Sequence, residues 1–508
     1  MASSELYPKG RQSSSNSDHV KGVLEKGPID GADVGVTALR GVVTDIDPDG
    51  LVARRVLRKI DLHLMPLLMV TYMIQFLDKS CVSYAALWGM KDDAHLIGAE
   101  YSWLTTIFYI GYLVFEFPVG YLFQKFNIAR TCGIFITLWG LVLLCMAAAN
   151  DFAGLAAARF FLGALEAGVS PCFVLMTTMF YKRSEQPFRT GIWFSMNGFA
   201  QIFGGLIAYG IGYIDAAVPA WKFPFIIFGA ATIIWGVVFT IFAPSNPTQA
   251  RWLTAEEKEI AVLRLVQNET GIDNKTFKWY QVKEALLDSR LWLMNLFVLL
   301  NCIPNGAVTA FGPLIINGFG YTKFQTTLLG MPSGAAQVLA LWISGYVAAK
   351  ATGCRHFLMI GGVLVAILGS SLIYALPEEQ GLGRLFGYYL IVGFSVAFVQ
   401  GLSLVQANVA GRSKKNVFTS AVFVSYCIGN VIGPQVFLER EEPRYHTGFI
   451  IIIACFALQV LLLIGMYLQN LFENRKRDQI ATGEDASDTE QILSDLTDKE
   501  NLHFRYVL

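Results

Sequence analysis

The sequence predicts an all-α membrane protein with twelve transmembrane helices arranged in two six-helix bundles. Two observations carry this prediction. The 508-residue chain is 54% hydrophobic and only 15% charged, whereas soluble domains contain about 25% charged residues. About twelve stretches of roughly 20 mostly apolar residues follow one another along the chain, and each is long enough to cross the hydrocarbon core of a bilayer.

The apolar stretches fall into two groups of six. The first group defines an N-terminal bundle over residues 56–243, with spans expected near 60–86, 101–123, 131–149, 153–180, 190–213 and 223–243. The second group defines a C-terminal bundle over residues 291–471, with spans expected near 291–316, 325–349, 356–376, 384–406, 416–438 and 447–471. The layout is therefore six spans, a long loop and six further spans.

Three polar segments flank the two bundles: residues 1–55, 244–290 and 472–508. The central loop contains TAEEKEIAVLRLVQ, in which apolar residues recur at helical spacing, so we expect a short amphipathic surface helix. The tail from Glu473 onward includes the acidic stretch ATGEDASDTEQ. Its low hydrophobicity and high charge predict a disordered segment.

Lysine and arginine are concentrated on one side of the predicted spans, as in RRVLRK at 54–59. Because cytoplasmic loops carry this excess, we expect both termini and the central loop in the cytoplasm. The first fifty residues lack the apolar run of a cleavable signal peptide. The prediction is a multi-pass protein of the plasma membrane.

Several classes of function are excluded by what the sequence does not contain. The formal net charge is zero, which gives no basic signature for nucleic acid. The sequence has no GxxxxGK[ST] motif, which argues against ATP-driven transport. It has no HExxH or GxSxG motif, which argues against the enzymes that carry them. The eight cysteines show no metal-ligand spacing. We therefore expect neither an enzyme nor a cofactor or metal site.

Four charged residues are predicted at membrane depth: Asp78 and Lys79 in the first span, and Arg159 and Glu166 in the fourth. A charge at that depth costs about 2.5–3.5 kcal/mol, so it is rare and usually functional. Arg159 and Glu166 are seven residues apart and share a helix face, either as a structural salt bridge or as an anion contact beside a proton carrier. Adjacent side chains point about 100° apart, so Asp78 and Lys79 cannot face one point. If the helix stops at Leu77, they are loop charges instead.

The polar residues within the spans of the second half are almost all uncharged. Its spans carry amides, which form hydrogen bonds between helices or shape a pocket for the substrate. The substrate-binding candidates among them are Asn301, Asn305 and Asn430. In the first half, Glu116 is a third buried carboxylate, which faces either the cavity or a gate.

Several stretches of the chain match a known family. They are RKIDLHLMPLLMVTYMIQFLDKS, RFFLGALEAGVSPCFVLMTTMFYKRSEQPFR, APSNPTQARWLTAEEKE and NVAGRSKKNVFTSAVFVSYCIGNVIGP. In them the chain resembles the anion:cation symporter family of the major facilitator superfamily, over about residues 55–475. The stretch FGPLIINGFGYTKFQTTLLGMPSGA is most similar to the fungal allantoate permease-like subgroup.

The resemblance implies a major facilitator fold and a role for each charged residue. Glu166 and Asp78 match the positions for proton coupling, and Arg159 and Lys79 match those for anion binding. Lys79 stands where the family usually has arginine. A fifth-helix amide is also expected in the pocket, and the candidates are Asn197 and Gln201.

The loop after the second span matches the gating pattern of the superfamily in part. Gly120, Lys125 and Arg130 are present in GYLFQKFNIAR, and Gln124 replaces the usual aspartate. The resemblance implies that the first three contribute to gating at the cytoplasmic side.

These observations together predict a secondary transporter that imports a small organic anion by proton symport through alternating access. A carboxylate such as allantoate or ureidosuccinate is the expected substrate. The alternatives are a proton symporter of a vitamin carboxylate (nicotinate, pantothenate or biotin) and an uncoupled anion exchanger or facilitator. The expected partners are the substrate, the proton and the lipid bilayer, with the protein acting as a monomer.

Overall fold

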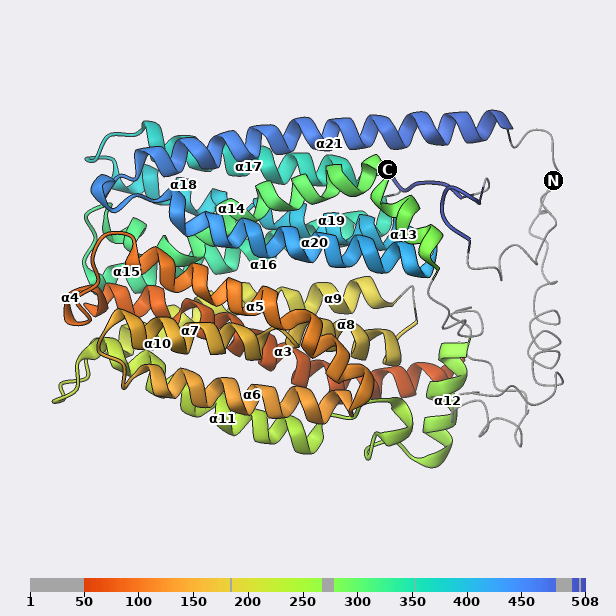
Figure 1. Ribbon diagram of the computed structural model, residues 1–508, viewed down its shortest axis with the longest axis horizontal. Helices are drawn as coiled ribbons and strands as arrows, with labels where there is room; N and C mark the ends of the chain where they lie inside the picture. The colour runs from red at the N-terminus through yellow and green to blue at the C-terminus, as the bar shows by residue number, and fades with distance from the viewer. Residues whose placement is uncertain (1–49, 183–184, 267–277, 352, 481–495, 502–503) are drawn as a thin grey trace, which may run out of the picture.

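The computed structural model describes residues 50–182, 185–266, 278–351, 353–480, 496–501 and 504–508. Every regular element in these residues is a helix. The helices form two groups that lie side by side, one built from α3 to α11 and the other from α14 to α21 (Figure 1). This arrangement confirms the predicted all-α class with two bundles.

The N-terminal half, which comprises α3 to α11, contains the first six predicted spans. Long apolar runs form these helices, and glycine or a turn separates them. Their bounds are α3 (Leu51–Leu87), α5 (Glu100–Lys125), α6 (Ile128–Met146), α7 (Phe152–Glu166) with α8 (Val169–Phe180), α9 (Gln186–Phe194) with α10 (Met196–Ile211), and α11 (Phe223–Phe242). The short α4 (Met90–Asp93) and η2 (Ala220–Lys222) lie in connections.

The C-terminal half, which comprises α14 to α21, contains the other six. Their bounds are α14 (Ser289–Asn317), α15 (Lys323–Leu329) with α16 (Met331–Lys350), α17 (Arg355–Ala375), α18 (Gly381–Ile391) with α19 (Phe394–Asn408), α20 (Arg412–Ile432), and α21 (His446–Ile480). The turns η4 (Gly433–Val436) and η5 (Glu439–Glu441) join α20 to α21. In the central loop lie η3 (Pro247–Gln249), α12 (Ala255–Val266) and α13 (Trp279–Leu286). The amphipathic helix predicted there is confirmed as α12.

Eleven helical segments of the described chain are long and apolar enough to cross a membrane. The predicted span 190–213 is not among them, and its helix is interrupted at Ser195. The α10 segment that follows has 16 residues, or about 24 Å at 1.5 Å per residue. The fifth span is therefore built from two helices, α9 and α10, instead of one.

The long helices end at two opposite faces of the molecule, and these faces carry different elements. We call the face with the start of α3, the end of α21 and the helices α12 and α13 the terminal face, and the other the opposite face (Figure 1). On the terminal face, the N-terminal half is held to α12 by ion pairs of Lys59 with Glu257 and of Arg264 with Glu185, both at 2.6 Å. These contacts attach the start of the central loop to the N-terminal half.

The tail from Glu473 onward was predicted to be disordered, and this is wrong for the part of it that the structure describes. Residues 473–480 continue α21, and residues 496–501 and 504–508 return to the C-terminal half. There Asp498 Oδ1 lies 2.8 Å from Lys414 Nζ, and the Tyr506 hydroxyl accepts a hydrogen bond from Arg477 at 3.0 Å. The stretch ATGEDASDTEQ and the first 49 residues lie outside the described residues. Residues 496–501 and 504–508 are held by side-chain partners on helices, and hydropathy contains no information about such partners.

Lys414 is the centre of a buried charge cluster on the terminal face. Its side chain is 0% exposed, and its Nζ lies 2.9 Å from Glu284, 3.0 Å from Asp288 and 2.8 Å from Asp498. Burial alone would raise the pKa of Asp288, but Lys414 and Arg290 beside it hold that pKa below its ordinary value. The cluster joins α13, the start of α14, the start of α20 and the returning C-terminal segment.

The halves touch each other through small residues and polar contacts. A Cβ atom on Gly198 of α10 would lie 2.5 Å from the carbonyl oxygen of Gly334 on α16, so only glycine allows this crossing. Nearby, Gln201 donates a hydrogen bond to Gln337 at 3.0 Å. Toward the opposite face, the Tyr101 hydroxyl donates to the Ala310 carbonyl at 2.6 Å.

Candidate functional site

A buried ion pair joins the first and fourth spans. Glu166, at the end of α7, is 0% exposed, and its Oε2 lies 3.5 Å from the Nζ of Lys79 on α3. The sequence placed Arg159 on the same helix face as Glu166, but the structure gives the ion pair to Lys79. Of the four predicted charges, these two therefore interact directly.

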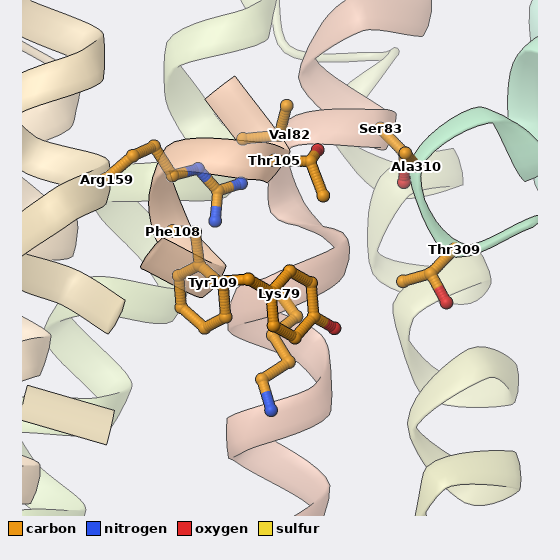
Figure 2. Close-up of a pocket in the computed structure, with 9 residues that line it drawn as sticks. All are labelled: Lys79, Val82, Ser83, Thr105, Phe108, Tyr109, Arg159, Thr309 and Ala310. Atoms are coloured by element: carbon orange, nitrogen blue, oxygen red, sulfur yellow. The ribbon is translucent and has the colours of Figure 1, made fainter. Parts of the chain in front are cut away.

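A small cavity lies beside this pair, between α3, α5, α7 and α14. It is lined by Lys79, Val82, Ser83, Thr105, Phe108, Tyr109, Arg159, Thr309 and Ala310. Figure 2 shows Arg159 and Lys79 entering the region from different helices, with Phe108 and Tyr109 between them. Two cations predicted from the sequence thus line one cavity at the boundary between the halves.

The ring of Phe108 lies close to both cations. Its centroid is 5.7 Å from Lys79 Nζ and 5.8 Å from the guanidinium carbon of Arg159. Cations within about 6 Å of an aromatic face are attracted by its quadrupole. Arg159 is only 2% exposed, and its Nε has no hydrogen-bond partner among the described residues. A buried cation with free donor capacity is suited to binding an anion.

Asp78 faces a different part of the N-terminal half. It is 0% exposed, and its Oδ2 accepts hydrogen bonds from Trp139 at 2.6 Å and from Thr232 at 2.9 Å. The alternative in which the helix stops at Leu77 is wrong, because α3 continues to Leu87. Asp78 and Lys79 therefore point in different directions within one helix, as the 100° rotation per residue requires.

The two fifth-span amides have different neighbours. Asn197 lies beside Tyr72 of α3, within the N-terminal half. Gln201 lies at the boundary between the halves, where it donates to Gln337 and accepts from the Ser333 hydroxyl at 2.8 Å. Sequence alone could not separate these candidates, since both lie on the same short helix.

The three amides of the C-terminal half are engaged in hydrogen bonds within that half. Asn301 donates to the Phe394 carbonyl at 3.2 Å, and Asn305 donates to Asn430 Oδ1 at 3.1 Å. Asn430 in turn donates to the Tyr426 carbonyl at 2.8 Å. In this state the amide groups of Asn301 and Asn305 tie α14 to α19 and α20, which is the interhelical hydrogen bonding that the sequence left open as one possibility.

The predicted gating residues lie on the terminal face. Lys125 and Arg130 are exposed, and Lys125 Nζ lies 6.0 Å from the centre of the Phe126 ring. A Cβ atom on Gly120 would meet no atom within 4 Å. The structure does not bring these three residues to the cavity.

Polar contacts that the sequence reasoning missed hold the loop between α5 and α6. Ser245, after α11, donates to Asn127 at 2.6 Å, and Asn127 donates to Gln249 at 3.2 Å. Asn127 also caps α6 by accepting from the Arg130 backbone N–H at 3.0 Å. The signal was present in the stretch APSNPTQA, where Ser, Asn and Gln follow a span directly.

The cavity residues contributed by α5 were also missed. Thr105, Phe108 and Tyr109 line the cavity, and Tyr112 follows with its ring centre 5.5 Å from Lys79 Nζ. Their spacing of three and four residues places them on one helix face, and that periodicity was readable. Nothing in the sequence distinguished this face from one packed in a core.

Two helical bundles that enclose buried cations and a buried carboxylate at membrane depth form the architecture of a membrane transporter. A family model described as Major Facilitator Superfamily matches residues 68–434. The chain therefore belongs to the Major Facilitator Superfamily. It is a multi-pass membrane transporter and not an enzyme.

Its relatives include fungal transporters. The chain is similar to the allantoate permease of Saccharomyces cerevisiae, with 36% identity over 472 residues that cover 90% of this chain and 86% of the relative. The thiamine pathway transporter of the same yeast is 36% identical over 458 residues, covering 89% of this chain and 86% of the relative. An uncharacterized transporter of Schizosaccharomyces pombe is 40% identical over 467 residues, covering 89% and 87%. The resemblance to the fungal allantoate permease-like subgroup is confirmed.

Solved structures show the same fold at low identity. The xylose transporter XylE of E. coli, in a partially occluded inward open conformation, superposes with a TM-score of 0.60 at 12% identity and covers 80% of this chain and 98% of that chain. At this identity the similarity concerns the fold alone.

Proposed function

We propose that this transporter imports a small organic carboxylate together with protons. The observation that carries the proposal is the Lys79–Glu166 ion pair (3.5 Å) beside Arg159 in a shared buried region. Lys79 and Arg159 balance Asp78 and Glu166 when both carboxylates are ionised, so protonation of Glu166 leaves a positive charge that a carboxylate substrate would compensate. The same carboxylate, Glu166, is the group that would carry the proton.

The geometry supports a competition between substrate and Glu166 for Lys79. When Glu166 is protonated, it loses the charge that attracts Lys79, and Lys79 can join Arg159 in binding the substrate carboxylate. When Glu166 releases its proton, it pairs with Lys79 again, as in this structure, and weakens the hold on the substrate. Proton release and substrate release are thereby linked.

Asp78 is proposed as a second proton-coupling group that acts inside the N-terminal half. Its hydrogen-bond donors, Trp139 and Thr232, are neutral residues of the N-terminal half. A change in its charge would reach the site through α3, because Lys79 is the next residue of that helix. Asp78 is therefore a positioning residue and not a substrate contact.

Alternating access is proposed to occur by rocking of the two halves. The contacts of Gly198 with Gly334, and of Tyr101 with Ala310, lie from mid-membrane toward the opposite face. With the termini proposed to be cytoplasmic, this is a state closed toward the outside. Gly120, Lys125 and Arg130 are proposed to act in gating on the cytoplasmic side.

The amides are proposed to contribute to substrate binding to different degrees. Asn197 is the favoured contact, because its neighbour Tyr72 is partly exposed and shares a face of α3 with Lys79. Gln201 would have to release Gln337 first. Asn301, Asn305 and Asn430 would act by shaping the C-terminal wall, since their amide groups bind backbone or one another.

Allantoate or ureidosuccinate is the proposed substrate, supported by the similarity to a protein named allantoate permease. The plasma membrane is the proposed location, with the protein acting as a monomer. Vitamin carboxylates and uncoupled exchange are the alternatives that the experiment must separate.

The test is uptake of radiolabelled allantoate by a transporter-deficient yeast that expresses the chain, at acidic and neutral external pH, with and without a proton uncoupler. Uptake that rises in acid and collapses with the uncoupler is expected. Uptake that ignores the uncoupler would favour a facilitator or exchanger. A signal for nicotinate or pantothenate in place of allantoate would keep the mechanism and change the substrate.

Glu166→Gln separates coupling from binding. The variant cannot release a proton at this position, so we expect it to lose proton-driven accumulation while it retains exchange of labelled for unlabelled substrate. The matched control is Glu379→Gln, an exposed position after α17, which should behave as the unaltered protein. Full proton-driven accumulation by Glu166→Gln would contradict the coupling role.

A further inference from the structure

Six aromatic side chains form a continuous row across the space between the two halves. We call this row the aromatic belt, a name that refers here only to these six side chains and not to aromatic residues at the membrane interfaces. Its members are Tyr72, Phe194, Phe398, Tyr426, Phe423 and Tyr112. Tyr72, Phe194 and Tyr112 belong to the N-terminal half, and the other three belong to the C-terminal half.

The belt crosses the boundary between the halves at two places. Phe194 of α9 meets Phe398 of α19 with ring centres 5.9 Å apart. Tyr112 of α5 and Phe423 of α20 are stacked, with ring centres 5.4 Å apart and an angle of 25° between the planes. Tyr426 connects the two crossings on the C-terminal side, at 5.8 Å from Phe398 and 5.9 Å from Phe423.

The belt adjoins the charged site directly. The ring centre of Tyr112 is 5.5 Å from Lys79 Nζ. Tyr72 and Lys79 are seven residues apart on α3 and therefore share a helix face, two turns from each other. Tyr109, which lines the cavity with Arg159, has its ring centre 6.1 Å from that of Tyr426. A carboxylate bound between Lys79 and Arg159 would bring the rest of its molecule within reach of these rings.

Two properties distinguish the belt from an ordinary aromatic core. The crossing pairs join halves that must move apart during transport, whereas core pairs would lie within one half. Tyr72, Phe194, Phe398 and Tyr426 also keep part of their surface accessible although they lie deep between the helices. Accessible ring faces beside a charged site can receive a ligand group.

We propose that the belt selects substrates in which a planar conjugated group lies next to the carboxylate. This inference rests on the proposed function and specifies the class of substrate: flat acids, with a heteroaromatic ring or a ureido group, in preference to saturated acids of equal size and charge. The carboxylate binds Lys79 and Arg159, and the planar group stacks against Tyr426. Aromatic stacking favours such contacts beyond area burial, by about 3- to 10-fold in affinity.

The experiment measures binding of matched acid pairs to the purified full-length protein by calorimetry. The pairs are benzoate with cyclohexanecarboxylate, and furan-2-carboxylate with tetrahydrofuran-2-carboxylate, which differ in planarity and agree in charge and approximate size. We expect each planar acid to bind about 3- to 10-fold more tightly than its saturated partner. Equal affinity within the pairs, or no binding by either planar acid, would overturn the proposal.

Variants of one belt residue connect the preference to the belt. Tyr426→Phe keeps the ring and should keep the preference, whereas Tyr426→Leu should bring the affinity ratio close to one. The control is Phe386→Leu, a ring on α18 that is 57% exposed and lies outside the belt. The melting temperature without ligand checks that each variant is folded. An unchanged ratio in a folded Tyr426→Leu would exclude this residue from the selection and overturn the proposal.

Arg159→Met distinguishes failure of this inference from failure of the proposed function. If the proposed function is right, this variant loses affinity for planar and saturated acids alike. If the variant binds all four acids as the unaltered protein does, carboxylate binding at this site is wrong. If planar acids were still preferred and the preference still depended on Tyr426, the rings would bind the planar group without a carboxylate contact to Arg159. The proposal as stated would then be wrong.

Discussion

The two halves of this transporter place their polar groups at different depths. The N-terminal half has three charged residues buried in its spans, Asp78, Arg159 and Glu166, and Lys79 is almost buried beside them. The C-terminal half has amides such as Asn301 at comparable depth, and its large charge cluster is on the terminal face around Lys414. Charge at membrane depth is costly and usually functional. We therefore expect the N-terminal half to bind the substrate and carry the proton.

The difference also concerns whether the charges are compensated. Lys414 has three carboxylates within 3.0 Å, whereas Arg159 lines a cavity with a free donor. Compensated charges contribute to stability, and an uncompensated one is available for binding. The comparison therefore predicts that removal of the Lys414 charge lowers the stability of the protein, whereas removal of the Arg159 charge impairs substrate binding.

The largest expected effect is the loss of stability on changing Lys414. In Lys414→Met, the buried carboxylates Asp288 and Asp498 lose their central cation, and breaking a buried charge cluster in this way costs about 3–5 kcal/mol. The melting temperature of the purified protein should fall markedly. The control is Lys476→Met on the exposed end of α21, which should leave the melting temperature unchanged. Equal melting temperatures for both variants would break the comparison.

Arg159→Met should show the opposite pattern. Burial of a cation that has no direct ion pair is costly, so its replacement by an apolar residue of similar length should leave the melting temperature the same or raise it. Affinity for the substrate carboxylate should fall by about 30-fold or more, since loss of one partner of a buried charge pair costs about 2 kcal/mol or more. Calorimetry and uptake measure this. A folded variant with unchanged affinity would remove Arg159 from the binding site.

Loss of a C-terminal amide should have a smaller effect. In Asn301→Ala, the hydrogen bond to the Phe394 carbonyl disappears, and such bonds between membrane helices are worth about 0.6 kcal/mol on average and about 1.7 at most. We expect a slightly lower melting temperature and nearly normal proton dependence of uptake. A loss of proton coupling in this variant would mean that the C-terminal half also carries the proton.

The smallest effect is a change in the pH dependence of stability. Lys414 and Arg290 hold the pKa of Asp288 below its ordinary value in spite of burial. Its ionised form therefore stabilises the folded protein above the ordinary pKa of about 3.9, and this contribution is lost as the pH falls through the lower pKa of the folded state. Asp288→Asn should weaken the fall in melting temperature below about pH 4. An identical acid profile for both proteins would exclude this contribution.

Much of the fold was predictable because hydropathy is a local property. The apolar runs located the helices, and the cost of buried charge singled out Lys79, Arg159 and Glu166, which the structure brings to one region. The interruption at Ser195 was not predictable, because nothing in a window of apolar residues marks a break. Neither was the ion pair of Glu166 with Lys79, since the partner of a side chain depends on how each helix is rotated in the bundle.

The C-terminal segment shows the limit of composition most clearly. Asp498 and Tyr506 belong to a stretch that is polar and short, which predicts disorder. They are held because Lys414, Arg290 and Arg477, distant in sequence, present cations and donors to them. Long-range complementarity of this kind cannot be read from a single stretch.

The glycine crossing of α10 and α16 has a practical consequence. One methyl group at Gly198 would collide with the Gly334 carbonyl, so Gly198→Ala disfavours the conformation with these helices in contact and favours any conformation in which they separate. The substitution alters no charge and no residue of the cavity. It offers a way to shift the conformational equilibrium for imaging of the alternate state, by shape alone and with the binding chemistry left intact.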